Sequence, residues 1–168
     1  RYVGVASRGR LGNVWANAEQ RDGHIWVGHS RGLARFRPDG FDWHYRLPGH
    51  EGPFQVWAML FDRDGRLWLA LDERVLALRP ADATETDPAP ALDAGDARAW
   101  TTRDDLVSRQ PGIIRQTADG RILIASGVWT HAGSGLNEFD GRTLRSYTID
   151  HGLSEDPIIS VAEDVSGN

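Results

Sequence analysis

Four short turns recur along the chain, and their spacing restricts the fold more than any other feature. Each turn ends in glycine, and the four are Asp22-Gly23, Asp64-Gly65, Asp119-Gly120 and Ser166-Gly167. Their glycines are 42, 55 and 47 residues apart. Such spacings are typical of repeat architectures, in which each repeat is one supersecondary unit that stacks on its neighbours. The chain is therefore expected to fold as an array of similar units.

The segments on either side of each turn have the composition of β-strands. The runs before the turns lie at 14–16, 56–58 and 158–160, and the runs after them lie at 25–28, 67–70 and 122–125. Two such runs joined by a tight Asp-Gly turn predict a β-hairpin. The second run is apolar without alternation, which indicates a strand that is covered on both faces.

Two further strands complete each predicted unit. Third strands are expected at 32–36, 75–78 and 135–139, and fourth strands at 41–45, 99–101 and 144–147. Four antiparallel strands in a repeat of this length are typical of a β-propeller blade. The predicted fold class is all-β, a β-propeller segment of about three four-stranded antiparallel blades. The blades are placed at 12–47, 54–103 and 111–149, with partial blades at 1–11 and 156–168.

The second repeat is 13 residues longer than the first, and the extra residues fall within 80–97. This stretch is rich in Pro, Ala, Asp and Thr and has few apolar side chains. We expect a surface loop that buries little, inserted within the blade.

About three blades cannot close a ring, because propellers need roughly four to eight. The repeat also breaks off within a blade at both ends of the sequence. We therefore expect a larger propeller, for example a seven-bladed one. The exposed blade faces would be covered by the remaining blades of the same propeller or by a second copy of the chain.

Composition excludes several classes of function. The net charge of -5 and the pI near 5.6 argue against a nucleic-acid partner or an anionic membrane surface. The absence of Cys excludes disulfides and thiol nucleophiles. No apolar run reaches the ~20 residues that span a bilayer, so no direct membrane contact is expected of this segment.

Neither a catalytic site nor a cofactor or metal site is predicted. The six His residues have no metal-ligand spacing, and no nucleophile elbow is present. Asp62 and Asp64 resemble the start of a calcium loop, but a hairpin turn explains them better. The tryptophans that recur in the repeat are interpreted as packing residues between blades; they are Trp15, Trp57, Trp26 and Trp68.

One loop stands out as a candidate ligand site. The step from the second to the third strand takes four residues from Gly28 to Gly32 but ten from Ala125 to Gly135. The added segment contains the candidate ligand-binding residues Trp129, Thr130 and His131. An aromatic ring beside a His and hydroxyls suits sugar stacking or a partner domain, although Trp129 could instead cover its own blade.

Arg115, on an innermost strand, is a fourth candidate because it could face the channel and meet a carboxylate or sulfate. The blade-to-blade segments around His50 and His151 are interpreted as ordinary connectors.

The motif residues resemble the two-component regulator propeller repeat. Its pattern "I-x-E-D-x-x-G-N-L-W-I-G-T", followed by "G-L-x-x-F" and "F-x-x-Y", is matched by 56–70, by 22–36 and by 158–168. Departures are Leu123 in place of Trp, and Ala70 and Ala125 in place of Gly. The resemblance implies a periplasmic or other extracytoplasmic sensor segment of a bacterial two-component protein. In some members of that family the signal is an oligosaccharide.

Two alternatives remain open beside the non-enzymatic sensor. One is a propeller enzyme, such as a lyase or a glycan-degrading enzyme, and the other is a protein-interaction propeller without a small ligand. An enzyme would need His, Glu or Arg side chains that project into the channel, whereas the inner strands offer mainly apolar residues.

Overall fold

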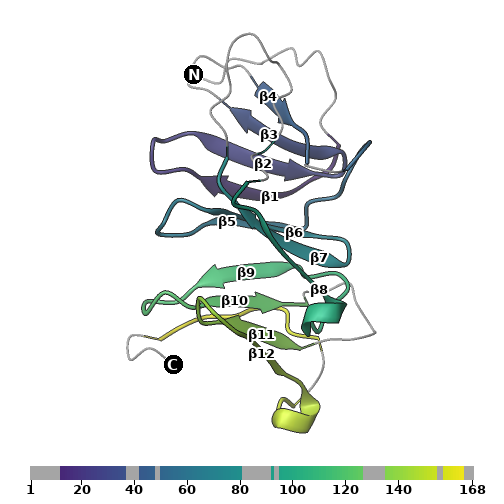
Figure 1. Cartoon of the computed structure of the whole chain (residues 1–168), viewed down its shortest axis with the longest axis vertical. Coiled ribbons are helices and arrows are strands. Elements are labelled where there is room, and N and C mark those ends of the chain that lie inside the picture. The colour runs from purple at the N-terminus through teal and green to yellow at the C-terminus, as the bar shows by residue number, and fades with distance from the viewer. Residues whose placement is uncertain are drawn as a thin grey trace.

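The computed structural model describes residues 12–36, 42–47, 50–80, 92, 95–126, 135–154 and 157–164. These residues form three four-stranded antiparallel sheets (Figure 1). The first contains β1 (Val14–Glu19), β2 (Ile25–His29), β3 (Gly32–Phe36) and β4 (Asp42–Tyr45). The second contains β5 (Ala58–Phe61), β6 (Leu67–Leu71), β7 (Arg74–Leu78) and β8 (Arg98–Thr101). The third contains β9 (Ile113–Gln116), β10 (Ile122–Ala125), β11 (Leu136–Phe139) and β12 (Leu144–Tyr147).

In each sheet the strands follow their order in the sequence, so each sheet is one blade. The predicted all-β fold of four-stranded antiparallel blades is confirmed. Helical segments in the described chain are the single turns η1 (Thr102–Asp104) and η2 (Ile149–His151). Neither has the length and apolarity that a membrane crossing requires.

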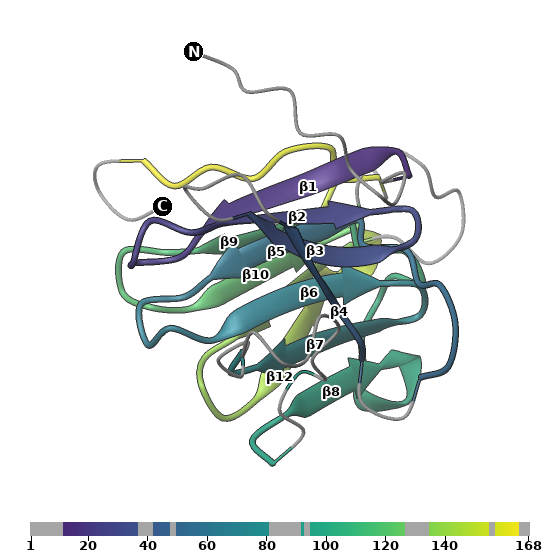
Figure 2. The ribbon, with the colours of Figure 1, turned by 90° about the horizontal axis from the view of Figure 1, so that it is seen from above.

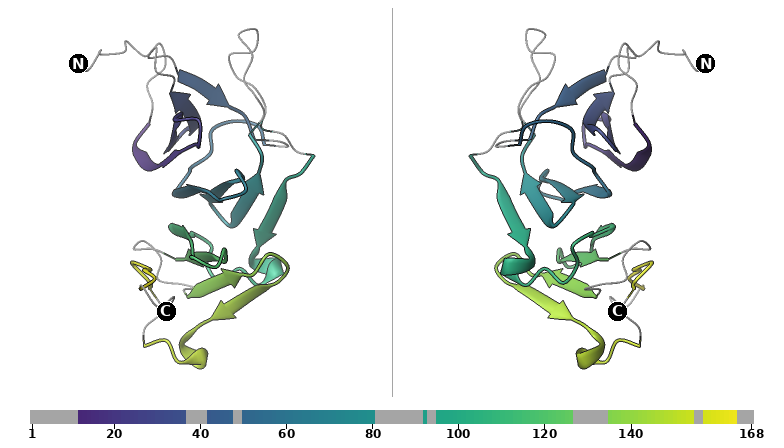
Figure 3. Two further views of the ribbon diagram at one scale, coloured as in Figure 1. Left: turned by 90° about the vertical axis from the view of Figure 1, so that its left-hand side faces the viewer. Right: turned by 90° about the vertical axis from the view of Figure 1, so that its right-hand side faces the viewer.

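The blades stack face to face, and Figure 2 views the ribbon along the stack. Two apolar clusters are buried between the blades. One cluster joins blades 1 and 2 and includes the fully buried Trp26 and Leu69. The other joins blades 2 and 3 and includes Trp68 and Ile124. Trp26 and Trp68 therefore pack between blades, as predicted. Figure 3 shows the three blades following one another, with β8 and β12 on the side away from residues 157–164.

The turn between the first two strands is built in the same way in all three blades. The glycines Gly23, Gly65 and Gly120 have φ of 85°, 76° and 96°, a conformation that favours Gly. Each donates its N–H to the carbonyl three residues earlier, at Gln20, Asp62 or Thr117. The positive φ at this position explains why each of these turns ends in glycine.

The side chain at that acceptor position holds the tryptophan of the second strand. The indole N–H of Trp26 donates to Gln20 Oε1 at 2.8 Å, and that of Trp68 donates to Asp62 Oδ2 at 2.8 Å. Asp62 Oδ1 also accepts the backbone N–H groups of Asp64 and Arg66, so its carboxylate is used by the hairpin. In blade 3 the tryptophan is replaced by Leu123, whose side chain has no N–H, and the residue at the acceptor position is Thr117.

A second recurring bond joins neighbouring blades. The acceptor is the side chain four positions before a turn glycine. The donor is a backbone N–H in the preceding blade, two positions before the turn glycine of that blade. Gln116 Oε1 accepts from Arg63 N at 2.9 Å, and Glu163 Oε2 accepts from Ala118 N at 2.6 Å. In blade 2 this position is Phe61, which packs on Trp26 instead.

Residues 157–164 contain no assigned strand but lie beside blade 3 (Figure 3). Ile158 N lies 3.4 Å from Ser126 Oγ, just after β10. Val56 N is similarly placed 3.4 Å from His29 O, at the end of β2. Residues 157–164 therefore lie beside blade 3 in the same way as the residues just before β5 lie beside blade 1.

The inserted segment 80–97 has an anchor that the sequence analysis did not anticipate. Leu92 is 1% exposed within the cluster of blades 1 and 2, and its N–H donates to Arg46 O at 3.0 Å. Asp96 forms ion pairs with Arg66 at 3.0 Å and with Arg79 at 3.6 Å. Leu92 is an exception to the expectation that this stretch buries little, and most of the stretch lies outside the described residues.

Candidate functional site

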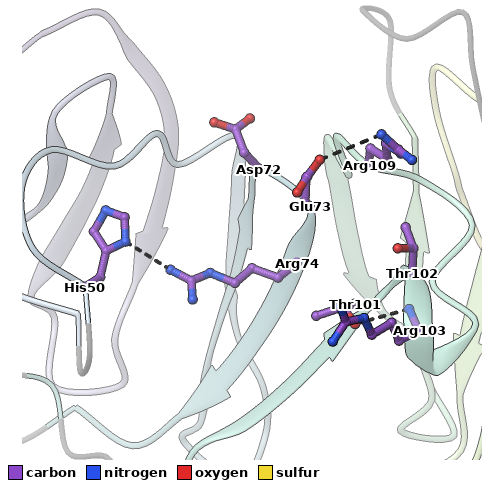
Figure 4. Close-up of a pocket in the computed structure, with 8 residues that line it drawn as sticks. All are labelled: His50, Asp72, Glu73, Arg74, Thr101, Thr102, Arg103 and Arg109. Carbon is purple, nitrogen blue, oxygen red and sulfur yellow. Dashed lines mark hydrogen bonds and ion pairs between the residues drawn. The ribbon is translucent and has the colours of Figure 1, made fainter.

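A pocket of about 560 Å³ opens on the rim where β6 turns into β7 (Figure 4). It is formed by that turn, the end of β8 and the connectors that precede and follow blade 2. The residues that line it are His50, Asp72, Glu73, Arg74, Thr101, Thr102, Arg103 and Arg109. Three separate parts of the sequence therefore meet at one end of blade 2.

The β6–β7 turn holds the middle of the pocket in a constrained geometry. Leu71 pairs with Arg74, so Asp72 and Glu73 alone make the turn. Glu73 has φ of 60°, a conformation that costs a residue with a side chain roughly 1–2 kcal/mol. Its N–H donates to Arg109 O at 2.5 Å, which ties the turn to the following connector. Backbone strain of this kind tends to persist at functional sites.

The far wall is the connector between blades 2 and 3. Thr101 and Asp104 form a capping box around η1, in which Thr101 Oγ1 accepts the Arg103 N–H at 3.2 Å. The fully buried Asn137 of β11 fixes the residues that follow, because its Oδ1 accepts Val107 N at 3.0 Å. Its amide nitrogen donates to Asp105 O at 2.9 Å. Arg103 and Arg109 therefore project from a connector that is fixed at the backbone.

The pocket carries few internal ion pairs. Arg109 Nη1 lies 3.9 Å from Glu73 Oε1, and both side chains are 72% exposed. Such a pair is solvated and contributes little to stability. Arg74 Nη2 faces His50 Nδ1 at 3.5 Å (Figure 4). Asp72 Oδ1 accepts the Trp57 indole N–H at 2.7 Å.

Trp57 links the rim pocket to a second, more open concavity of about 300 Å³. This concavity lies along the first strands β1, β5 and β9, and its lining includes Trp15, Asn17, Trp57, Met59 and Arg115. The Trp15 and Trp57 rings are 5.8 Å apart, and Trp15 is 45% exposed. Trp15 thus contacts the next blade, as a packing residue would, but also presents a face to solvent.

The structure places one of the four predicted ligand-binding residues. Arg115 is exposed on β9 and lines the concavity of the first strands. Trp129, Thr130 and His131 lie outside the described residues. Within the described chain, no group of three His, Asp or Glu side chains is placed to hold a metal ion.

The rim pocket itself was missed by the sequence analysis. His50, which was interpreted as part of an ordinary connector, lines it. A signal was available in the three consecutive charged residues between the apolar runs, Asp72 and Glu73 in the turn and Arg74 as the first residue of β7.

Comparison with known proteins places the fold. No protein-family model and no curated protein sequence matches the chain. Among solved structures, the extracellular domain of a protein described as a hybrid two-component system of B. thetaiotaomicron has a TM-score of 0.64 and 15% identity. The match covers 96% of this chain and 21% of that domain. The chain has the fold of a propeller segment.

Two further structures extend the likeness. The extracellular domain of a protein described as a one-component system of B. thetaiotaomicron matches with a TM-score of 0.63 and 18% identity, over 98% of this chain and 21% of that one. Virginiamycin B lyase from Staphylococcus aureus matches with a TM-score of 0.56 and 15% identity, over 84% of this chain and 42% of that one. The chain thus spans about a fifth of the extracellular domains that it resembles, and the fold is shared by proteins of different function.

Proposed function

We propose that this chain is a ligand-binding segment of the extracytoplasmic, periplasmic propeller of a bacterial two-component sensor, without catalysis of its own. The observation that carries the proposal is the rim pocket, which is assembled from the β6–β7 turn and two blade connectors. Recognition sites commonly lie in loops on a rigid scaffold. The likeness to the extracellular domains of signalling proteins favours a sensor among the functions that propellers serve.

The proposed ligand is an oligosaccharide or a similar hydroxyl-rich small molecule. Trp129, Thr130 and His131 are retained as proposed contacts, because the β10–β11 connection leaves its blade at the same end as the β6–β7 turn. Arg115 and the half-exposed Trp15 would extend the surface along the first strands. Further blades of the propeller are the proposed partners of the exposed sheet faces.

A propeller lyase is the second candidate, favoured by the likeness to virginiamycin B lyase. Lyase chemistry needs a general base close to the substrate. The described lining of the first-strand concavity contains neither His nor a carboxylate, whereas the rim pocket contains His50, Asp72 and Glu73. Asp72 accepts the Trp57 indole N–H, and Glu73 is solvated beside Arg109. We therefore favour binding over catalysis, with turnover as the result that would reverse this choice.

The test is a thermal-shift screen of the chain against neutral and acidic oligosaccharides, with product analysis by chromatography. A sensor is expected to show a specific shift without turnover, and Arg74→Ala is expected to abolish the shift. Arg142→Ala is the matched control, because Arg142 lies in the β11–β12 turn on the opposite rim and its side chain is exposed. Turnover would favour the lyase, and the absence of any shift across the screen would contradict small-ligand binding.

A further inference from the structure

The charge of the rim pocket differs in sign from that of the chain. The chain carries a net charge of -5, whereas the pocket lining has three guanidinium groups and two carboxylates. A cationic pocket in an anionic protein attracts anions locally while the rest of the surface repels them. The net positive charge of the pocket lining therefore favours an anionic ligand.

Neither carboxylate neutralises the pocket closely. Asp72 accepts the indole N–H of Trp57 at 2.7 Å, on the side of the first-strand concavity. Glu73 lies 3.9 Å from Arg109, and both groups are largely solvated. Within the described part of the chain, Arg74 and Arg103 take part in no ion pair. Two guanidinium groups are thus available to a ligand.

The neighbours of Arg74 are arranged to keep it available. Its contact within the pocket is His50 Nδ1, at 3.5 Å. In the tautomer that carries its hydrogen on Nε2, which lies 3.3 Å from Pro53 O, Nδ1 can accept a hydrogen bond from the Arg74 guanidinium. His50 brings no negative charge that would cancel the charge of Arg74. On the other side, η1 and its capping box hold the backbone of Arg103.

We propose that the rim pocket binds a ligand that carries a carboxylate on a hydroxyl-rich ring, such as a sugar acid. Guanidinium groups bind carboxylates through paired, charge-assisted hydrogen bonds. The exposed Thr102 hydroxyl can donate a hydrogen bond to a ring hydroxyl or accept one from it. This inference rests on the proposed function and names the class of ligand for the same site.

The experiment uses glucuronate and glucose as a pair of probes that differ at one carbon, with acetate as a carboxylate without a ring. Binding to the full chain is measured by saturation-transfer NMR, which detects weak ligands. Glucuronate is expected to bind at least about tenfold more tightly than glucose or acetate, as one charge-assisted contact would give. Raising the salt concentration is expected to weaken the binding of glucuronate, because the attraction is electrostatic.

Variants locate the contact. Arg74→Gln and Arg103→Gln are each expected to remove most of the preference for glucuronate while the chain stays folded by circular dichroism. Arg142→Gln, on the opposite rim, is the matched control and is expected to keep it. Full preference in both pocket variants would overturn the assignment of the site.

The outcomes separate this inference from the proposed function. If neutral sugars bind as tightly as glucuronate, and the binding depends on the pocket, the carboxylate inference fails while the sensor proposal stands. If acetate binds as tightly as glucuronate, the ring has no role and the ligand class is wrong. If none of these probes and no oligosaccharide of the wider screen binds, the proposed function itself fails.

Discussion

At the scale of single residues, the indole of the second-strand tryptophan is the most informative group. Trp68 is 3% exposed, stacks on Trp100 with ring centroids 5.2 Å apart, and donates its N–H to Asp62. Asp62 is itself 8% exposed, so its carboxylate depends on protein donors for much of its hydrogen bonding. Each of these tryptophans thus connects the blade interface to the hairpin turn.

Trp68→Phe is expected to destabilise the chain by about 1–3 kcal/mol, because it removes a donor to a buried carboxylate. Urea unfolding followed by circular dichroism measures the change. Trp15→Phe is the matched control, since Trp15 is 45% exposed and its indole N–H has no partner among the described residues. An equal loss in both variants would show that ring size, and not the hydrogen bond, decides the effect.

A titration at the β11–β12 turn offers a second test. The backbone N–H groups of Thr143 and Arg142 and the Thr143 hydroxyl hydrogen-bond to Asp140 and lower its pKa to about 2. Because the folded pKa lies below the unfolded one, the turn is stabilised above about pH 4, and this contribution is lost as the pH falls towards 2. NMR titration of the Asp140 carboxyl is expected to give a midpoint near 2 in the folded chain. A midpoint close to 4 would contradict the role of these donors.

At the scale of elements, the bond between successive hairpins recurs where the sequence supplies an acceptor. Glu163→Ala is expected to cost about 0.5–1.5 kcal/mol and to speed hydrogen exchange of the Ala118 amide, whereas Glu163→Gln keeps an acceptor and is expected to retain most of the protection. The matched control is Glu19→Ala. Glu19 holds the same repeat position, but its side chain has no hydrogen-bond or ion-pair partner in the described chain, so its truncation should leave Ala118 exchange unchanged. Faster Ala118 exchange in Glu19→Ala would refute this account.

Close packing of blades 1 and 2 gives a further test at Gly28. A Cβ at this position would lie 2.5 Å from Val56 Cγ1. Gly28→Ala is therefore expected to destabilise the chain by about 1–3 kcal/mol. In a Val56→Ala background, which removes the 2.5 Å contact but keeps the Val56 Cβ at 2.8 Å, the same change is expected to cost less without becoming neutral. Equal costs in both backgrounds, measured by urea unfolding, would place the strain elsewhere.

The elements were predictable from the sequence because their signals are local. The Asp-Gly turns and the apolar runs around them define each hairpin within about twenty residues, and the sheets follow from hairpin geometry. The rim pocket was not predictable in the same way, because it joins His50, Arg74 and Arg109 from three separate segments. Leu92 was missed for a similar reason, since one apolar residue in a polar stretch gives no periodic signal.

At the scale of the whole molecule, the three blades differ in how they are covered. Blade 2 packs against blade 1 through one apolar cluster and against blade 3 through the other. Blades 1 and 3 each share one of these clusters. In blade 1, Ile25 at the start of β2 is 41% exposed, although Val27 and His29 on the same face of the strand are buried. Every residue of β6 in blade 2 is buried.

This difference predicts the order in which the blades open. In a linear repeat array, the stability of a unit is its own plus that of its interfaces, and among the described residues blade 2 contributes to both apolar clusters whereas blades 1 and 3 contribute to one each. The amides of β6 and β7 are therefore expected to exchange at least tenfold more slowly than those of β2 and β3, a gap of about 1.4 kcal/mol in opening free energy. Hydrogen exchange resolved by NMR measures it. Equal protection in all three blades would contradict this order and would mean that they open as one unit.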